Sequence, residues 1–547
     1  MLPVLVGIIL KFGLLLPVSS SILKVLHVID YLVLALLGLE VATGYFHSRP
    51  FWRHWRYAWF DTLILFFAGL LVAIGSYATL LIVVRQLVAL GRSFTRLGGL
   101  MEEVQKRPVA LLALSFLVLI ILGVSLLMLP AATRDQTGAP LITALFTATS
   151  AVCVTGLVLV DIGTYFSRFG QIVILVLIQL GGLGIMTFYA GLAALVGGHL
   201  GLAQRRTLTT VIDESRQVQI GRALRYILLF TLLAEGAGAS LLFIRWLPEH
   251  ATTLQAAYYA IFHAISAFCN AGFSLFSRNM VAYQTDPLVN LVVIGLIISG
   301  GLGFGTVHEL FNRETIRQPV RGLFRHLTAH ARLVLVTTAI LIGTGFLLFL
   351  LLEFNNALAG LNFPAKLLAA LFQAVTPRTA GFNTVPTNFL RPATTFLWTL
   401  FMFIGASPGG TGGGIKTTTA AVLFLTIRNL ALGRRDTEYA GRTITKDTVY
   451  RAAAIATLAA AVVVLSFSVL LLTESHPFQN LLFEAVSAFG TVGLSTGITS
   501  SLSVVGRLCL VILMFTGRTG PLTLALLFRP REKQLPITYP RARIMVG

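Results

Sequence analysis

The segment Ala151-Val152-Cys153-Val154-Thr155-Gly156-Leu157 decides the fold of this chain, because its pattern returns three more times. The related segments are Ala267-Phe268-Cys269-Asn270-Ala271-Gly272-Phe273, residues 374–382 and Ala488-Phe489-Gly490-Thr491-Val492-Gly493-Leu494. Their shared glycines are evenly spaced, since Gly272 follows Gly156 by 116 residues and the next two intervals are 109 and 112 residues. Self-similarity at a fixed period is the mark of repeated structural units. We therefore predict four copies of one short loop.

The composition is that of a membrane protein. Of the 547 residues, 56% are hydrophobic and only 11% are charged, whereas soluble domains carry about 25% charged residues. Apolar runs long enough to cross about 30 Å of hydrocarbon recur in four pairs. They lie near residues 110–130, 169–196, 226–247, 287–308, 332–352, 395–425, 450–473 and 504–528. The sequence thus predicts eight spanning helices.

Between the two helices of each pair lies a shorter apolar segment that ends at the shared glycine, for example residues 141–150 or 479–487. Segments this short cannot cross a membrane, and non-helical backbone is tolerated at that depth only where it lines a cavity. Each segment therefore predicts a re-entrant half-helix and a loop. The expected fold class is an all-α polytopic membrane protein. Four repeated units of helix, re-entrant pore loop and helix would surround a central pore in a pseudo-fourfold arrangement.

These units divide the chain into six parts. Residues 1–107 are expected to hold N-terminal accessory membrane helices, near 22–46 and 57–84, and a basic linker. Part of a voltage-sensor module is the alternative for this region, because an aromatic stretch at 55–61 and several arginines after residue 84 would suit one. The four pore repeats and the cytoplasmic tail follow as residues 108–200, 201–308, 309–425, 426–530 and 531–547.

Lysine and arginine gather in the segments that join one unit to the next, residues 201–226, 309–332 and 428–451, and in the tail. The positive-inside rule places these segments in the cytoplasm. We therefore expect a multi-pass protein of the plasma (inner) membrane with its pore loops facing outside. The formal net charge of +20 lies mostly in the basic segments. Short basic juxtamembrane loops attract anionic lipid headgroups or an acidic partner, so a nucleic-acid role is not expected.

Glycine at the shared position suits a pore for a dehydrated monovalent cation. Such an ion needs several oxygens at close range, which a ring of backbone carbonyls can supply. Glycine has no Cβ and accepts the positive φ that turns the preceding carbonyls inward. Each half-helix also directs its C-terminal end, with about half a negative charge, into the membrane. We predict that a monovalent cation, which the resemblance described next specifies as potassium, binds at the carbonyls of a selectivity filter formed by Cys153, Val154, Thr155, Gly156, Cys269, Asn270, Ala271, Gly272, Thr379, Ala380, Gly381, Gly490, Thr491, Val492 and Gly493.

At the third and fourth loops the chain resembles the Trk/Ktr/HKT superfamily of potassium transporters, in particular the bacterial membrane subunits of the Ktr and Trk systems. The residues that carry the resemblance are Phe372-Gln373-Ala374-Val375-Thr376-Pro377-Arg378-Thr379-Ala380-Gly381-Phe382-Asn383-Thr384 and Glu484–Ser495, within a similar region at 108–530. The resemblance implies a pseudo-fourfold monomer, usually a homodimer, on a cytosolic ring of nucleotide-binding regulatory subunits. Members with serine at the first filter glycine tend to carry sodium, so four glycines favour potassium. Sodium is kept as a candidate activator, and no organic cofactor is expected.

A second glycine-rich stretch, residues 405–414, interrupts the second helix of the third unit. Its glycines and its proline cannot continue a helix. In the families that the chain resembles, the matching stretch is an intramembrane loop that obstructs the pathway. An arginine in the position of Arg518 lies below their filter, although an arginine reaching the inner interface is the alternative here. The predicted gate residues are Gly409, Gly410, Gly412, Gly413, Gly414, Lys416 and Arg518.

The glycines of the second helices do not predict a nucleotide-binding site. Ile415 separates Gly414 from Lys416, so the Gly-Lys-Ser/Thr step of a P-loop fails. One glycine of each second helix follows the filter glycine at a nearly constant offset: Gly181, Gly300, Gly409 and Gly517. Inside spanning helices these glycines predict an interruption, and the clusters that begin at Gly181 and Gly300 favour close helix packing or a bend.

Two further functions compete with potassium uptake. The potassium-binding subunit of an ATP-driven pump also has four pore-loop units, but the third loop reads Pro377-Arg378-Thr379-Ala380-Gly381 instead of that family's asparagine- and glycine-rich pattern. A sodium-conducting member of the same superfamily is the other alternative. An enzyme is not expected, because the apolar segments hold no paired carboxylates and no nucleophile with its base. We interpret Cys153 and Cys269 as small packed residues and Glu484 as a hydrogen-bond anchor.

Overall fold

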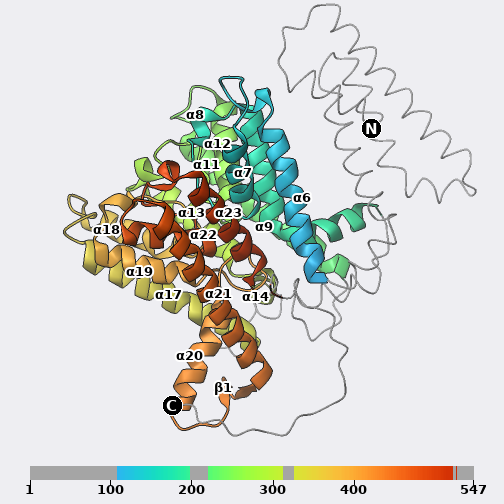
Figure 1. The fold of residues 1–547 in the computed structure, drawn as a ribbon, viewed down its shortest axis with the longest axis vertical. Coiled ribbons are helices and arrows are strands. Elements are labelled where there is room, and N and C mark those ends of the chain that lie inside the picture. The colour runs from blue at the N-terminus through green and yellow to red at the C-terminus, as the bar shows by residue number, and fades with distance from the viewer. Residues whose placement is uncertain (1–107, 197–219, 312–325, 522–524, 526–547) are drawn as a thin grey trace, which may run out of the picture.

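The computed structural model describes residues 108–196, 220–311, 326–521 and 525. The predictions for residues 1–107 and for the tail lie outside these ranges, as do residues 197–219 and 312–325 of two basic segments. Within the described part, the chain is almost entirely helical (Figure 1). The prediction of a mostly helical protein is confirmed at this level.

The described helices follow the chain in four groups. The first group holds α6 (Pro108–Leu127), α7 (Leu141–Val152), the one-turn α8 (Ile162–Tyr165) and α9 (Arg168–Val196). The second holds α11 (Ile220–Trp246), α12 (Thr253–Phe268), α13 (Pro287–Gly301) and α14 (Phe304–Leu310). The third holds α17 (Ala329–Glu353), α18 (Phe363–Val375), α19 (Pro392–Phe403) and α20 (Thr417–Ala431). The fourth holds α21 (Lys446–Thr473), α22 (Phe478–Gly490) and α23 (Val504–Thr519).

Short polar residues fix where several of these helices begin. Thr252, Asn362 and Ser503 each accept a hydrogen bond from a backbone N–H three residues later, at the starts of α12, α18 and α23. Asp286 accepts two such bonds at the start of α13, where Pro287 takes the first helical position without losing a needed donor. Caps of this kind satisfy N–H groups that have no partner inside the helix. The starts of two half-helices, α12 and α18, are therefore set locally.

Three of the described helices are long and apolar enough to cross a membrane: α11 from Tyr226, α17 and α21. The pair α13 and α14 counts as a fourth if it is one span, bent by 108°. In the first three, only 22% to 28% of the apolar window is buried inside the protein, and Leu351 and Leu472 are 75% and 87% exposed. Apolar helices of this length with an exposed apolar surface are suited to hydrocarbon. The chain is a multi-pass membrane protein.

Two of the second helices bend at the last glycine of the clusters that begin at Gly181 and Gly300, and α23 ends before Gly520. Non-helical backbone with positive φ occurs at Gly184 (φ 71°) inside α9, at Gly303 (φ 86°) between α13 and α14, and at Gly520 (φ 88°) after α23. Each of these glycines lies three residues after the glycine of nearly constant offset, namely Gly181, Gly300 or Gly517. In the third group the helix already ends at Phe403, six residues before Gly409.

The earlier glycines instead permit a close approach to the half-helices. A Cβ at Gly181, Gly300 or Gly517 would lie closer than 3.0 Å to the carbonyl of Val152, Phe268 or Phe489, respectively. These three carbonyls lie in the last turn of α7, α12 and α22. Each half-helix end is thus pressed against the second helix of its own group. This is the predicted close packing, while the bend lies at the last glycine of the cluster, Gly184 or Gly303.

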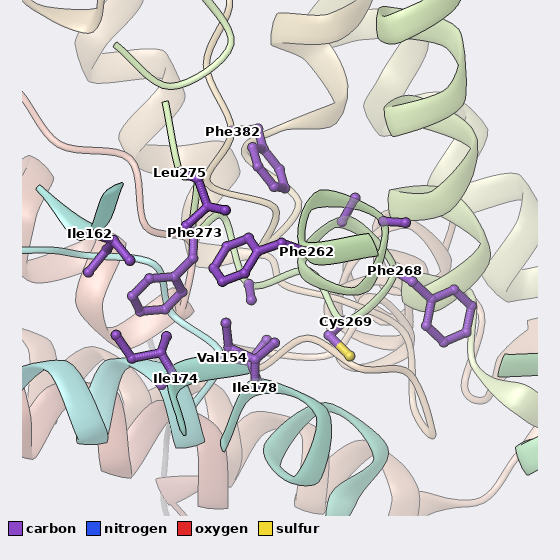
Figure 2. Close-up of a cluster of buried hydrophobic side chains, with 14 of the residues drawn as sticks. Val154, Ile162, Ile174, Ile178, Phe262, Phe268, Cys269, Phe273, Leu275 and Phe382 are labelled. Atoms are coloured by element: carbon purple, nitrogen blue, oxygen red, sulfur yellow. The ribbon is translucent and has the colours of Figure 1, made fainter. Parts of the chain in front are cut away.

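The filter loops contribute to the buried core. Figure 2 shows Val154, Cys269, Phe273 and Phe382, from the loops of three different groups, in one hydrophobic cluster with Ile178 of α9. A second cluster combines large side chains of α7 and α22 with two residues that follow filter glycines. The helix residues are Phe146, Phe483 and Phe489, and the loop residues are Leu157 and Leu494. Burial of this apolar surface from several segments is the main term that holds such elements together.

A two-stranded hairpin extends from α20 at one end of the molecule (Figure 1). Its strands β1 (Thr437–Tyr439) and β2 (Arg442–Ile444) are antiparallel, and among the described residues they are the sole strands. Asn429 of α20 donates from Nδ2 to the carbonyl of Glu438 at 3.2 Å. The basic segment 428–451 is therefore a structured projection, where the sequence predicted only a loop.

Candidate functional site

The four filter segments share one backbone conformation. Two residues before each shared glycine, a residue other than glycine has positive φ: Val154 (56°), Asn270 (61°), Thr379 (67°) and Thr491 (50°). The shared glycines also have positive φ, between 69° and 91°. Three of the four non-glycine residues with positive φ, Val154, Thr379 and Thr491, are β-branched. Positive φ is an outlier for β-branched residues. Such backbone persists only where its surroundings enforce it, and it clusters at functional sites.

A hydroxyl in the half-helix, or directly after it in the third group, ties each loop back to its helix. It donates a hydrogen bond to the carbonyl of the residue that follows the shared glycine. The four pairs are Ser150 with Leu157 (2.8 Å), Ser266 with Phe273 (2.8 Å), Thr376 with Phe382, and Ser487 with Leu494 (2.6 Å). The backbone carbonyls of the same four hydroxyl residues accept the N–H of the residue before the glycine, at 2.7–3.0 Å. The filter prediction did not include these residues, although a serine or threonine five or six positions before each glycine was a visible signal.

The four glycines close a ring. A Cβ on any of them would lie closer than 3.0 Å to the carbonyl that precedes the glycine of another loop. The pairs are Gly156 with Ala271, Gly272 with Ala380, Gly381 with Val492, and Gly493 with Thr155. Each loop therefore abuts the next in chain order, and the fourth abuts the first. No larger residue fits at these positions without moving the neighbouring loop.

The predicted filter residues belong to these loops, except Gly490 at the end of α22, and all are buried apart from the half-buried Gly493. The thiol of Cys269 contacts Gln179 Oε1 at 3.5 Å. Arg378 takes the position in the third loop that Cys153 and Cys269 take in the first two, and it too is buried. No group of three metal-ligating side chains occurs within the described residues. The interpretation of the cysteines as packed side chains fits this arrangement.

The segment between α19 and α20, residues 404–416, is here called the gate loop. Backbone bonds hold its shape and position: Gly405 N–H donates to Ile415 O at 2.8 Å, and Thr411 N–H donates to Gly300 O at 3.0 Å. Thr411 Oγ1 also donates to Phe268 O, at the carbonyl end of α12, at 3.2 Å. The gate loop thus lies on the side of the ring where the half-helices end.

Two glycines of the gate loop touch the filter itself. Gly413 N–H donates to Thr491 Oγ1 at 2.9 Å. A Cβ at Gly412 would lie closer than 3.0 Å to the side chain of Thr379, and a Cβ at Gly413 equally close to Thr491. The two threonines are the positive-φ residues of the third and fourth loops. Gate loop and filter are therefore in direct contact.

The remaining predicted gate residues stabilise the gate loop. Lys416 Nζ donates to Gly412 O at 2.6 Å. Gly414 N–H donates to Gly517 O at 3.1 Å, and Gly409 O accepts the N–H of Phe304 at 3.2 Å. Gly410 N–H donates to Ser407 O within the loop at 3.1 Å. The loop is thereby fastened to the second and fourth groups as well as to itself.

Arg518, in the last turn of α23, links the gate loop to the first group. Its Nη1 donates to Thr411 O, and its Nη2 donates to Gly181 O and, at 3.5 Å, to Gly182 O. The guanidinium carbon lies 5.9 Å from the ring centre of Phe116. These partners are backbone carbonyls of the gate loop and of α9. A fixed cation near an ion path raises the energy of a passing cation.

Glu484 behaves as the predicted anchor. Its Oε1 accepts from Ser495 Oγ at 2.5 Å and from Thr496 N–H at 3.1 Å, while its Oε2 accepts from Thr499 Oγ1 at 2.9 Å. All three donors follow the fourth filter segment. A buried carboxylate with its oxygens satisfied in this way fixes the loop.

Two other acidic residues were not identified from the sequence. Glu353, at the end of α17, accepts from Thr394 Oγ1 at 2.5 Å and from Asn356 Nδ2 at 2.6 Å. Glu235, inside α11, accepts from Gln179 Nε2 at 3.2 Å. An acidic residue within a membrane span is costly unless it has a partner. Both carboxylates have one, and a single acidic residue in an apolar run was the only sequence signal.

Comparison with known proteins gives consistent matches. The family model TrkH, described as "Cation transport protein", matches residues 94–536. "Ktr system potassium uptake protein B" of Bacillus subtilis (strain 168) is 38% identical over 444 residues, which cover 80% of this chain and 97% of that protein. "Potassium/sodium uptake protein NtpJ" of Enterococcus hirae is 35% identical over 455 residues, which cover 82% of this chain and 99% of that protein.

A solved structure agrees at the level of the fold. The crystal structure of the potassium transporter TrkH from Vibrio parahaemolyticus matches with a TM-score of 0.62 at 20% sequence identity. The match covers 77% of this chain and 84% of that one. At this identity the likeness concerns the arrangement of the helices alone.

Proposed function

This chain belongs to the TrkH family of cation transport proteins, which are transporters and not enzymes, and on that premise we propose that it carries potassium into the cell through the ring of four glycine loops. The observation that carries the proposal is the closed cycle in which each glycine abuts the carbonyl before the next one. Four units of helix, pore loop and helix, with the boundaries given above, would then surround a central pathway.

The chemistry of the ring suits potassium. The paired positive-φ residues of each loop allow carbonyls to face a common axis, where they replace the hydration shell of the ion. The four half-helices end at the ring, and their partial negative charges favour a cation. Glycine at all four positions supports potassium as the main cargo. Sodium remains the alternative cargo or activator, since the relative from Enterococcus hirae is named a potassium/sodium uptake protein.

The gate loop and Arg518 would close this pathway in the resting state. The loop lies against Thr379 and Thr491 of the filter, and Arg518 bonds to the loop carbonyl of Thr411. An ion that leaves the ring on this side would meet a buried loop and a fixed cation. Opening therefore requires the gate loop to move.

Control would come from a cytosolic ring of nucleotide-binding subunits on which two copies of this chain dock. The basic segments would face the cytoplasm and the filter loops the outside of the plasma membrane. The hairpin after α20 is a candidate docking point, because Arg435 is exposed while Arg434 is engaged with Glu438 at 2.8 Å. Replacement of Arg435 by glutamate should weaken co-purification of the partner and leave membrane insertion unchanged. A complex that is retained in full would contradict this docking point.

Uptake in a host that lacks its own potassium-uptake systems tests the main proposal. Expression of this chain with one cytosolic partner should restore growth at low potassium, and rubidium should compete with the uptake. Uptake that requires an ATPase subunit would instead support the pump alternative. Sodium uptake that potassium does not inhibit would support the sodium-conducting one.

A further inference from the structure

The gate loop and the filter share one direct hydrogen bond, from Gly413 N–H to Thr491 Oγ1 at 2.9 Å. Building on the proposed function, we propose that Thr491 is a positioning residue through which the gate loop holds the fourth filter strand in place. Displacement of the gate loop would then change ion selectivity as well as flux. The gate and the filter would be one coupled device.

The backbone of Thr491 depends on support from its surroundings. It is left-handed, with φ 50° and ψ 48°, a conformation that is an outlier for a β-branched residue. Its N–H donates to Ala488 O at 3.1 Å, and its hydroxyl accepts from Gly413. A strained residue keeps its conformation only while its neighbours over-determine it. The gate loop supplies one of these constraints.

The contact is also steric. A Cβ at Gly413 would lie closer than 3.0 Å to both Oγ1 and Cγ2 of Thr491. The loop backbone therefore fits against both branches of the threonine side chain. A residue held on both branches cannot change its rotamer or its φ without displacing the loop. Conversely, withdrawal of the loop removes the donor and the steric barrier together.

The consequence for the ring follows from the next residue. The carbonyl of Val492, directly after Thr491, is the one that abuts Gly381 in the ring. Relaxation of the Thr491 backbone rotates the peptide that precedes Val492 and moves this carbonyl. One of the four contacts of the ring is then loosened. The discrimination between potassium and sodium should fall when the gate loop is displaced.

Displacement of the gate loop should not affect the four filter loops equally. Thr379 lies against Gly412 in a similar way, and its hydroxyl lies 3.3 Å from the side chain of Asn270. The side chain of Val154 has no group that can form a hydrogen bond to the gate loop. It packs near Ile178 in the hydrophobic cluster (Figure 2). The coupling is therefore assigned to the third and fourth loops, with its hydrogen bond on the fourth.

The test measures two quantities, basal potassium flux and the potassium-to-sodium flux ratio, in proteoliposomes. Thr491→Val keeps the shape of the side chain and removes the acceptor, and the loss of one buried hydrogen bond should change each quantity roughly fivefold. Flux should rise and the ratio should fall. Thr491→Ser keeps the hydroxyl and should change both quantities less than Thr491→Val does. Gly413→Ala, which pushes on Thr491 from the loop side, should shift the ratio in the same direction as Thr491→Val.

A double-mutant cycle separates coupling from two independent effects. In a chain whose gate loop is shortened between Gly409 and Gly414, Thr491→Val should lower the ratio no further. If Thr491→Val raises flux with an unchanged ratio, or lowers the ratio equally in both backgrounds, the coupling is refuted. Gly156→Ser distinguishes this from failure of the filter itself. If that variant also transports with an unchanged ratio, the assignment of the filter is at fault.

Discussion

The four filter loops share three features, whereas one of the four second helices that support them departs from the other three. Every loop has the left-handed residue, the hydroxyl tie and the abutting glycine. The second helices bend at Gly184, Gly303 and Gly520, but the third opens into the thirteen-residue gate loop, 404–416. In a closed ring, each loop is held in place by contacts with the two neighbouring loops. The shape of a supporting helix depends only on its own local contacts. Asymmetry can therefore arise in the support and leave the ring intact.

The largest change in the potassium-to-sodium flux ratio should come from replacing one of the four equivalent glycines of the ring. Gly156→Ser places a side chain at positive φ, which costs roughly 1–2 kcal/mol, and drives it against the carbonyl of Ala271. We expect the potassium-to-sodium flux ratio to fall about tenfold, since 1.4 kcal/mol corresponds to a factor of ten. Gly272→Ser should act in the same direction. Gly343→Ala, where a Cβ meets nothing within 4 Å, is the control and should keep the wild-type ratio.

The next effect should come from removing the asymmetric element. Shortening the gate loop between Gly409 and Gly414 removes the loop atoms next to Thr379 and Thr491. Basal potassium flux without a partner should then rise severalfold, because the obstruction and the support of Lys416 at Gly412 are lost together. Flux is measured in proteoliposomes after membrane insertion has been verified. Resting flux equal to that of the wild type would place the gate elsewhere.

Arg518 should have a smaller effect of the same sign. Arg518→Ala removes the bonds to Thr411 and Gly181 but leaves the backbone bonds of the gate loop. Basal flux should rise less than after shortening of the loop. Arg518→Lys keeps the charge but cannot bridge two carbonyls in the same way, so it should give an intermediate flux. A lysine variant with the flux of the alanine variant would show that the bridge matters more than the charge.

The smallest effect should come from one hydroxyl tie. Ser266→Ala removes the bond to Phe273 O, worth about 1 kcal/mol, and should lower the thermal stability of the purified protein in potassium. The matched control is Ser240→Ala, because Ser240 is exposed on α11 and bonds only within its own helix to Gly236 O. Equal shifts in the midpoint of unfolding for the two variants would contradict a special role for the tie.

The sequence predicts the glycines of the ring and the gate loop better than the bends and buried polar groups of the surrounding helices. Gly156, Gly272, Gly381 and Gly493 were visible because a fixed period marks them. The bend at Gly184 was not distinguished from Gly181, because the two glycines look alike until the carbonyl of Val152 is placed beside one of them. Glu235 was missed because its partner, Gln179, lies on another helix. Local rules locate glycines and caps, whereas the partner of each group depends on how distant segments pack.

The ring has one further consequence, which concerns how the protein is made. Its last contact joins Gly493 to the carbonyl of Thr155, from the two ends of the pore region. Chains emerge from the ribosome with the N-terminal part first, so the first loop must wait in the membrane until almost the whole protein has been synthesised. A nascent chain that stops before the fourth loop has three strands and an open side. Such a fragment lacks Val492 and Gly493, so the contacts that these residues make with Gly381 and Thr155 are missing and the ring stays open.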